Sequence, residues 1–251
     1  MLDMFSLNHY IWFLVAIILF YAVYRLLRDL SDKKKFIFLF SLSVLAWIIH
    51  FSRIWLKPDV MPHEIFFVDL CGFSTMVYPF FMLSKKKILK DYMYFVGGIF
   101  ALSSLAYPNN IAGDPVFIYN TIRFFFAHWI LIAIPLLLVL WKLHTPNIRN
   151  IGYMYLFVIV IAWYNMALSA LFVELGYVNT LINYMGLWGN TESVYNLSEI
   201  IAPFFRYSTV VAGETITKPI PFFYMLPTLT VVFVPLWVLM SLPFRKKEKQ
   251  E

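Results

Sequence analysis

Apolar segments of membrane length recur along the whole chain and restrict it to the membrane-embedded classes of fold. A helix needs about 20 mostly apolar residues to cross the hydrocarbon core of a bilayer. Seven segments come close to or exceed this length, so we expect an all-α membrane protein, a bundle of about seven transmembrane helices forming a single polytopic domain over residues 1–251. The expected spans are 8–27, 36–56, 64–83, 91–107, 122–141, 151–173 and 221–241.

The composition agrees with this reading and excludes two other classes of protein. Hydrophobic residues make up 61% of the chain and the mean hydropathy is +0.74, values far from those of a soluble domain. The net charge of +6 comes from short basic clusters between apolar segments, which is not the pattern of a nucleic-acid-binding surface. We therefore expect no nucleic-acid partner. A single cysteine excludes an internal disulfide and leaves thiol nucleophile chemistry open.

The distribution of lysine and arginine predicts the orientation of the chain in the membrane. With the N-terminus outside, the connections and tail on the inner side hold 15 of the 20 basic residues. Because positively charged connections stay on the cytoplasmic side, this asymmetry predicts the N-terminus outside and the C-terminus inside. The long connection 174–219 then lies outside. Its aromatic residues suit either a lid over a lipid-facing site or a loop at headgroup level.

The third predicted span carries the only cysteine of the chain. On a helix, Cys71, Ser74, Thr75 and Tyr78 follow one another at i, i+3, i+4 and i+7, and so form one polar stripe on an apolar rod. Such a stripe has to face protein or water instead of lipid. We expect Cys71 to be a nucleophile and Ser74, Thr75 and Tyr78 to lie on the substrate face. In the fourth predicted span, Gly97 and Gly98 indicate a packing face for a neighbouring helix.

Polar residues of several predicted spans gather at one depth in the outer half of the membrane. Counted from the outer ends of their spans, Cys71, His128 and His50 all lie roughly 9–10 Å down at 1.5 Å per residue. Intramembrane ionisable residues are costly and usually mark functional sites. Each residue alone has an ordinary structural explanation, such as packing for the histidines or snorkelling for an arginine. Further polar residues lie within about two turns of this depth: Asn165, Ser169, Asp69 and Arg53.

The chemistry that suits this set of residues is acyl transfer, either by a lipid acyltransferase or by a lipid hydrolase that uses a cysteine nucleophile. A thiol in an apolar site needs a base to take its proton during attack, and a neutral imidazole such as His128 is the usual base. Asn165, Arg53 or backbone amides, with His50 and Asp69 in support, would stabilise the oxyanion. The ester carbonyl of a phospholipid lies near the junction of headgroup and acyl chain, so membrane phospholipids are the expected partners. The sequence indicates no oligomeric state.

Three other readings remain open from the residues alone. The polar layer could be the substrate or proton site of a small transporter, although the inner half of the bundle lacks a polar track and no inverted repeat is visible. It could bind haem or a metal through Cys71 and the two histidines, but the close ligand spacings of such sites are missing. We therefore expect no cofactor and no metal. It could also belong to a structural membrane protein without chemistry. A rhodopsin-like photoreceptor is disfavoured, because the last span has no lysine for a Schiff base.

Two stretches resemble a known family. The stretch FFVDLCGFSTMVYPFFMLSKKKILKDYMYFVGG and the later IRFFFAHWILIAIPLLLVLW are similar to the bacterial YwaF-like integral membrane proteins and their animal relative, the transmembrane protein 164 acyltransferase. In that family the Cys of a Leu-Cys pair and the His of a Phe-x-x-His motif are the proposed catalytic pair, and they correspond to Cys71 and His128. The bacterial members commonly have His and Asp where this chain has Asp69 and Gly72, so the helper residues differ.

The resemblance implies a reaction and a location. It implies transfer of a fatty acyl chain between a phospholipid and a lysophospholipid through a Cys71 thioester, with His128 as general base. It also implies an integral protein of the bacterial cell membrane.

Overall fold

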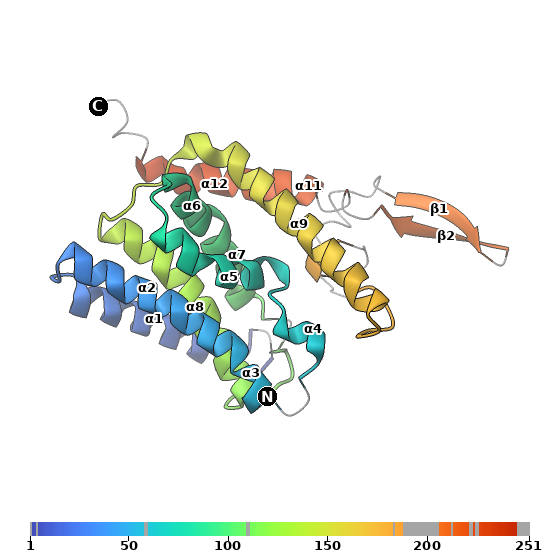
Figure 1. Ribbon diagram of the computed structural model, residues 1–251, viewed down its shortest axis with the longest axis horizontal. Coiled ribbons are helices and arrows are strands. Elements are labelled where there is room, and N and C mark those ends of the chain that lie inside the picture. Colours follow the sequence, from blue (N-terminus) through green and yellow to red (C-terminus); the bar gives the residue numbers. More distant parts are fainter. Residues whose placement is uncertain are drawn as a thin grey trace. The chain divides into compact units, whose positions relative to one another are not determined.

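The computed structural model divides the chain into two compact units, Met1–Asn150 and Ile151–Glu251 (Figure 1). We describe each unit by itself, and the expected single domain stays a prediction. The structure describes residues 2–3, 5–57, 60–108, 111–182, 184–187, 206–211, 213–220, 223 and 226–244.

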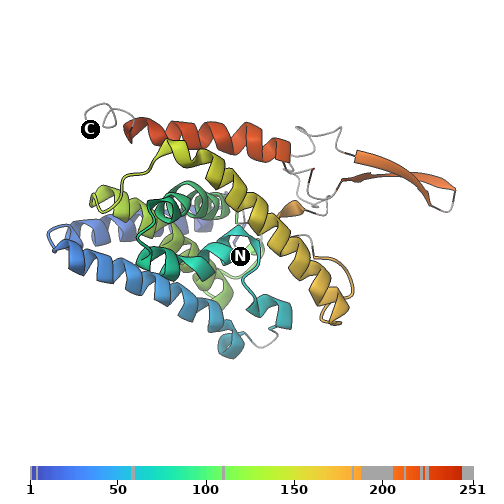
Figure 2. The ribbon, with the colours of Figure 1, turned by 45° about the horizontal axis from the view of Figure 1, so that its top comes forward.

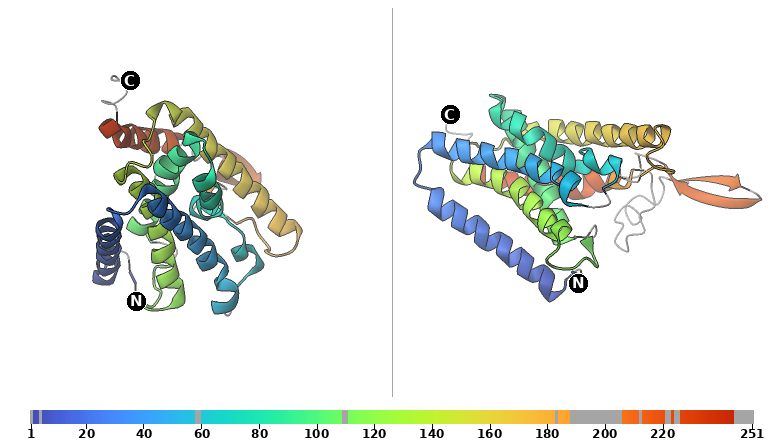
Figure 3. Two further views of the ribbon diagram at one scale, coloured as in Figure 1. Left: turned by 60° about the vertical axis from the view of Figure 1, so that its left-hand side comes forward. Right: turned by 60° about the horizontal axis from the view of Figure 1, so that its bottom comes forward.

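The first unit is a bundle of helices. Figure 3 shows α8 between α1 and α2, and these two helices both contact α8. Helix α8 also packs along α7, and α5 packs against α2 and the α6–α7 segment. The elements are α1 (Leu7–Leu27), α2 (Asp32–Phe51), α3 (Arg53–Leu56), α4 (Pro62–Ile65), α5 (Asp69–Leu83), α6 (Lys87–Tyr92), the π-helical turn η1 (Met93–Gly97), α7 (Gly98–Ala106), α8 (Tyr119–Leu140) and the short η3 (Ile148–Asn150).

In its described residues, the second unit contains two long helical segments, a short 3₁₀ turn and a β-hairpin. In Figure 2 the last helical segments, α11 to α12, continue as one rod. Strands β1 and β2 pair antiparallel, from Arg206 opposite Pro219 to Val211 opposite Glu214, and Gly213 at the turn has φ 85°. The elements are α9 (Ile151–Glu174), η4 (Tyr184–Gly186), β1 (Arg206–Val211), β2 (Glu214–Pro219), α11 (Leu226–Thr228), the π-helical η6 (Leu229–Phe233), α12 (Val234–Ser241) and η7 (Leu242–Phe244).

The helical class of the bundle is confirmed, and in the described residues helix covers most of each predicted span, although the span 64–83 is interrupted. Among the described residues, four helices are long and apolar enough to cross a membrane: Leu7–Leu27, Asp32–Leu56, Tyr119–Leu140 and Ile148–Glu174. The count of seven spans and the N-outside orientation stay predictions. The hairpin was not predicted, because the connection 174–219 was read only for its aromatic anchors. The central part of that connection, residues 188–205, lies outside the described residues, so the lid stays a prediction as well.

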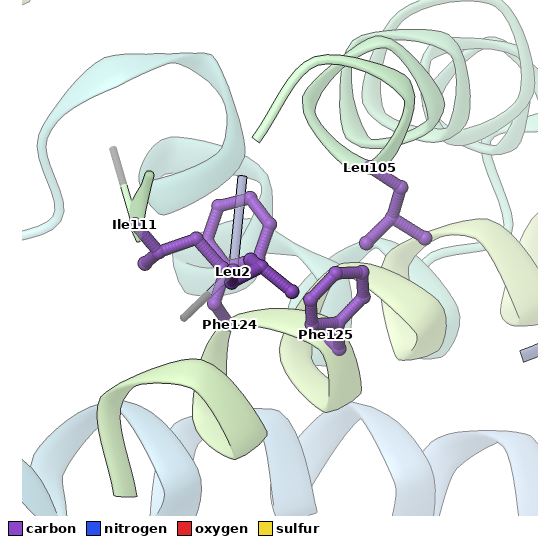
Figure 4. Packing of buried hydrophobic residues seen from close by; sticks show 5 residues of the cluster. All are labelled: Leu2, Leu105, Ile111, Phe124 and Phe125. Atoms are coloured by element: carbon purple, nitrogen blue, oxygen red, sulfur yellow. The ribbon is translucent and has the colours of Figure 1, made fainter. Parts of the chain in front are cut away.

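The beginning of the chain is fixed against the ends of α7 and α8. Figure 4 shows Leu2 among a cluster of buried side chains from these helices and their connection: Leu105, Ile111, Phe124 and Phe125. The backbone of Leu2 also pairs with that connection, because its N–H donates to Asp114 O at 2.7 Å and its carbonyl accepts from Gly113 N at 2.8 Å. The His9 ring donates from Nε2 to Leu105 O at 2.8 Å. The N-terminal residues are therefore part of the bundle core.

Two prolines inside helices each leave a carbonyl that a side chain of another helix satisfies. Proline has no N–H, so the carbonyl four residues before it loses its helical partner. Pro79 leaves the Thr75 carbonyl without its helical donor, and this carbonyl accepts instead from Trp47 Nε1 at 2.8 Å. Pro135 likewise leaves the Leu131 carbonyl without its helical donor, and this carbonyl accepts from the Tyr78 hydroxyl at 3.1 Å. Because unpaired carbonyls are costly in an apolar interior, these bonds hold α5 to its neighbours.

Gly97 and Gly98 form the packing face that the sequence predicted. A Cβ at Gly97 would lie 2.2 Å from the Tyr78 hydroxyl oxygen, and a Cβ at Gly98 would lie 3.2 Å from Cγ of Pro135. The Tyr78 hydroxyl also reaches Met93 O, in the π-helical turn, at 3.1 Å. Only glycine at position 97 therefore allows Tyr78 to come this close to the backbone.

The predicted single helix over 64–83 is wrong, because the chain breaks between α4 and α5. A continuous helix would bond the carbonyls of Glu64 and Ile65 to N–H groups four residues on. Instead, Arg53 Nη1 donates to Glu64 O, and His50 Nε2 donates to Ile65 O at 2.8 Å. Helix α5 then begins at Asp69, whose φ is 59° and whose Oδ1 accepts from Gly72 N at 2.8 Å. The carboxylate thus caps the new helix.

A buried polar network joins the connection after α8 to α6. The Asp91 carboxylate is fully buried, and its Oδ1 lies 2.7 Å from His144 Nε2. The same carboxylate accepts from the backbone N–H of Asn147 at 3.3 Å and from Asn150 Nδ2 at 2.5 Å. Since a buried charge needs partners of this kind, the network fixes the connection between α8 and η3.

Candidate active site

Cys71 lies in the first turn of α5 and is half-buried. This place corrects the expectation that Cys71 lies roughly 10 Å down a continuous helix over 64–83. Its Sγ lies 3.6 Å from Ser104 Oγ on α7. The Ser104 hydroxyl donates to Phe100 O at 3.0 Å, so its oxygen can accept from the Cys71 thiol. The Cys71 carbonyl accepts from Thr75 Oγ1 at 2.9 Å. The sulfur is therefore oriented from α7, while the side chain stays partly accessible.

His128 has its tautomer fixed by a carbonyl of its own helix. Its Nδ1 lies 2.7 Å from Phe124 O, and because a carbonyl can only accept, Nδ1 carries the proton. The lone pair of the neutral ring is then on Nε2, the nitrogen that a general base uses. The His128 side chain is half-buried. The ring also lies against Phe124, with ring centroids 4.2 Å apart.

The helix directions follow from four contacts. Cys71 meets Ser104 whereas Tyr78, further along α5, meets Gly97, so α5 and α7 are antiparallel. Gly98 lies near Leu131 O whereas Leu105 clusters with Phe124 and Phe125, so α7 and α8 are antiparallel as well. Helices α5 and α8 therefore run in the same direction.

This direction sets Cys71 and His128 at one level. Tyr78 bonds Leu131 O, and the residues seven positions earlier in each helix are Cys71 and Phe124. Cys71 therefore lies at the level of Phe124. Helical side chains point back toward the N-terminus of their helix, and the His128 ring reaches Phe124 O. The thiol and the imidazole thus share a level in the bundle.

His50 and Arg53 contact the backbone at the break before α5. Besides its bond to Glu64 O, Arg53 donates from Nε to His50 O at 3.0 Å and from Nη2 to His50 Nδ1 at 3.4 Å. The His50 ring stacks on Phe67 with ring centroids 4.1 Å apart. These two residues, with the Asp69 cap, determine where α5 begins and hence where Cys71 lies. Their predicted support of an oxyanion stays a prediction.

The polar stripe faces protein, as expected. Ser74 and Tyr78 are fully buried, and Thr75 is buried. Ser74 Oγ lies 2.9 Å from the Tyr92 hydroxyl, Thr75 bonds the Cys71 carbonyl, and Tyr78 bonds backbone carbonyls of two other helical elements. Cys71 is the one half-buried member of the stripe. That Ser74, Thr75 and Tyr78 contact a substrate stays a prediction.

Asn165 and Ser169 belong to the second unit. Asn165 is fully buried, and its Nδ2 donates to Ile161 O at 2.9 Å and lies 3.5 Å from Met185 Sδ. Ser169 Oγ accepts from Ile182 N at 2.8 Å and lies 3.1 Å from Ile182 O. Both residues fix the segment after α9 onto that helix. The role of Asn165 at an oxyanion stays a prediction.

Arg123 is a further charged residue near the candidate pair, which the sequence analysis does not name as a site residue. It is half-buried on α8, five residues before His128. Its charge lies within electrostatic range of Asp69, His50 and His128. An arginine inside an otherwise apolar helix was the signal that could have identified it.

Residues that could hold a metal do not cluster in the described part of the chain. No group of three or more His, Cys, Asp or Glu side chains with metal-binding geometry occurs there. The haem or metal reading of Cys71, His50 and His128 therefore gains no support from the described residues.

A family model matches the chain over residues 4–241, nearly its whole length, and its description is the TMEM164 family. The chain belongs to the TMEM164 family. No curated protein and no solved structure matched the chain. Membership in the TMEM164 family confirms the resemblance seen around Cys71 and His128. With the four long apolar helices, it identifies an integral membrane protein.

Proposed function

We propose that this TMEM164-family protein is a cysteine-dependent lipid acyltransferase, in which Cys71 is the nucleophile and His128 the general base. The observation that carries the proposal is the level that the two side chains share, with His128 Nε2 as the unprotonated nitrogen. The half-buried Cys71 thiol, oriented by Ser104, supports it. A pair of thiol and neutral imidazole is the usual arrangement for covalent acyl transfer.

In the first half of the reaction, Cys71 takes the acyl chain from a phospholipid. The thiol proton moves to His128 Nε2 as the sulfur attacks the ester carbonyl, and a tetrahedral oxyanion forms. When the carbonyl reforms, the C–O bond breaks and the lysophospholipid oxygen takes the proton from His128. The product is a thioester on Cys71. Since the Asp69 carboxylate occupies the Gly72 N–H, we expect a side chain such as Arg53 to stabilise the oxyanion.

In the second half, the acyl chain moves to an acceptor. The hydroxyl of a lysophospholipid gives its proton to His128 Nε2 and attacks the thioester carbonyl. The C–S bond breaks, and the Cys71 sulfur takes the proton back. Both halves use the same two groups, so loss of either side chain should stop both.

Mass spectrometry of the purified full-length protein in phospholipid nanodiscs tests the proposal. Wild type should carry an acyl adduct on Cys71 that hydroxylamine removes, and added lysophospholipid should discharge it. Cys71→Ala should carry no adduct. His128→Gln should form it about 100-fold more slowly or worse, because general-base catalysis contributes about 10²–10⁴-fold. Ser103→Ala, on the exposed side of α7, serves as the control. Turnover of lipid with unmodified Cys71, or an unchanged rate in His128→Gln, would contradict the mechanism.

A further inference from the structure

Positive charge gathers at the end of the bundle next to Cys71. The hydroxyls of Ser52 and Tyr119 lie 2.7 Å apart and hold the end of α2 to the start of α8. Arg53 follows Ser52 in the chain, and Arg123 lies one turn after Tyr119. The two guanidinium groups are therefore brought to the same rim of the first unit. Both arginines are half-buried.

The charges at this rim are not balanced by the described side chains. Lys57 and Glu64 neutralise each other, with Nζ 2.5 and 2.7 Å from the two carboxylate oxygens. Arg53 donates hydrogen bonds to neutral groups, namely two carbonyls and the His50 ring. Glu64 and Asp69 are both in electrostatic range of the two arginines, but the Glu64 charge is already matched by Lys57, so Asp69 is left as the counter-charge for two guanidinium groups. Because half-buried charges are costly without a counter-charge, the rim favours an anion.

Arg123 has the capacity to bind that anion. A guanidinium has five N–H donors in a planar fork that matches the oxygens of a phosphate. In the described part of the chain, one hydrogen bond of Arg123 is recorded, from Nη2 to Asn120 Oδ1 at 3.2 Å. Asn120 in turn donates to Asp114 Oδ2 at 2.8 Å, so its amide is fixed. Arg123 is thus oriented by a neutral residue and keeps most of its donors for another partner.

We propose that Arg123 binds the phosphate of a glycerophospholipid whose ester carbonyl lies at Cys71. Arg123 is five residues nearer the start of α8 than His128, which is about 7 Å along the helix. In a glycerophospholipid the phosphate and the ester carbonyls are separated by the glycerol carbons, a distance of the same order. The phosphate would thus sit nearer the membrane surface than the carbonyl. This inference rests on the proposed function and assigns the residue that selects phospholipids over neutral glycerides.

The first test compares two acyl donors in detergent micelles that contain no other phospholipid. The rate of acyl-adduct formation on Cys71 is measured with phosphatidylcholine and with diacylglycerol. Arg123→Gln should slow the reaction with phosphatidylcholine by roughly 10- to 100-fold, the contribution expected of charge-assisted hydrogen bonds. The reaction with diacylglycerol should change by less than about threefold, because diacylglycerol has no phosphate for Arg123 to bind and a substitution without a specific contact has only a small effect. Arg25→Gln, an exposed arginine on α1, is the matched control and should change neither rate.

The outcomes separate this inference from the proposed function. Equal slowing with both donors would show that Arg123 acts on the catalytic pair and would overturn the inference while leaving the acyltransferase intact. An unchanged rate with phosphatidylcholine would overturn it as well. Absence of any adduct in wild type would instead remove the proposed function.

A second measurement needs no chemistry. The ligand is a diether phosphatidylcholine, which has no cleavable ester. Native mass spectrometry measures how much of this lipid stays bound to the full-length protein. Wild type should retain about tenfold more than Arg123→Gln, and a diether glycerol without phosphate should show no such difference. Displacement of the lipid by excess inorganic phosphate would identify a site for a soluble anion and overturn the headgroup assignment. Equal retention by both proteins would overturn the inference irrespective of catalysis.

Discussion

The thiol sulfur of Cys71 lies 3.6 Å from the hydroxyl oxygen of Ser104, and that hydroxyl in turn donates to Phe100 O. Ser103 makes the same kind of bond to Phe100 O, at 2.8 Å, but is exposed on the other side of α7. The two neighbouring serines therefore differ mainly in their relation to Cys71. In the proposed acyltransferase, Ser104 is a positioning residue that directs the thiol.

Ser104→Ala should slow acylation of Cys71 by about fivefold, the value of one neutral hydrogen bond, and Ser103→Ala should not. The rate of adduct formation measures the effect. A positioning role also predicts that maleimide labelling of Cys71 changes its pH profile in Ser104→Ala, because the thiol loses its acceptor. Identical profiles in wild type and both variants would contradict a role for Ser104.

The Tyr78 hydroxyl donates to the carbonyl that Pro135 leaves without a helical donor. Substitutions at these two positions should therefore have non-additive effects on the free energy of unfolding. Tyr78→Phe leaves Leu131 O buried without this donor and should lower the free energy of unfolding by about 1–3 kcal/mol. Pro135→Ala restores a backbone N–H that can bond Leu131 O. The double variant should therefore lose less than the sum of the single variants in thermal unfolding in detergent. Additive losses would show that the hydroxyl does not replace the missing N–H.

Gly97 should not tolerate a side chain. Gly97→Ala puts a methyl group 2.2 Å from the Tyr78 hydroxyl oxygen, so either α5 or the π-helical turn has to move. We expect a loss of about 1–3 kcal/mol in stability, as for other overpacked cores. Gly152→Ala is the control, because a Cβ at Gly152 meets nothing within 4 Å. Equal melting temperatures for the two variants would contradict the close approach.

The buried pair of Asp91 and His144 should contribute strongly to stability. Asp91→Ala removes the partner of His144 and of the Asn150 amide, and breaking a buried pair from one side costs about 3–5 kcal/mol. Asp29→Ala breaks the exposed pair with Arg28 and should have little effect. Thermal unfolding of both variants in the same detergent makes the comparison. A small loss in Asp91→Ala would show that the connection after α8 is held by other contacts.

Glu64 predicts a dependence of stability on pH. Burial raises the pKa of its carboxyl, but the hydrogen bonds from Lys57 and Met61 N, with the charges of Lys57 and Arg53, outweigh burial and leave the pKa below its ordinary value of 4.5. A carboxyl with a lowered pKa stabilises the fold above its unfolded pKa, and the contribution disappears as pH falls through the folded pKa. Wild type should therefore lose stability relative to Glu64→Gln below about pH 4.5. Parallel melting curves from neutral to acid pH would contradict this.

The sequence by itself determined the membrane class, the helical segments and the candidate pair. Whether a segment enters the membrane depends on the free energy of transferring its own side chains and backbone into lipid. The length of each apolar segment and the charges beside it therefore carry this information locally. The spacing of Cys71, Ser74 and Tyr78 likewise predicted a protein-facing stripe, because helical periodicity alone defines a face. The family resemblance around Cys71 and His128 was also readable from local motifs.

The tertiary structure decided where the third predicted span breaks and which groups approach the thiol. Helix α5 begins at Asp69 because Arg53 and His50, from α3 and α2, take the carbonyls that a continuous helix would have used. The register of α5 against α7 makes Ser104 the neighbour of Cys71, which the sequence of neither helix indicates. Hydrogen bonds between distant segments leave no periodic signal in a sequence, since they depend on how the helices pack and not on the residues of one helix.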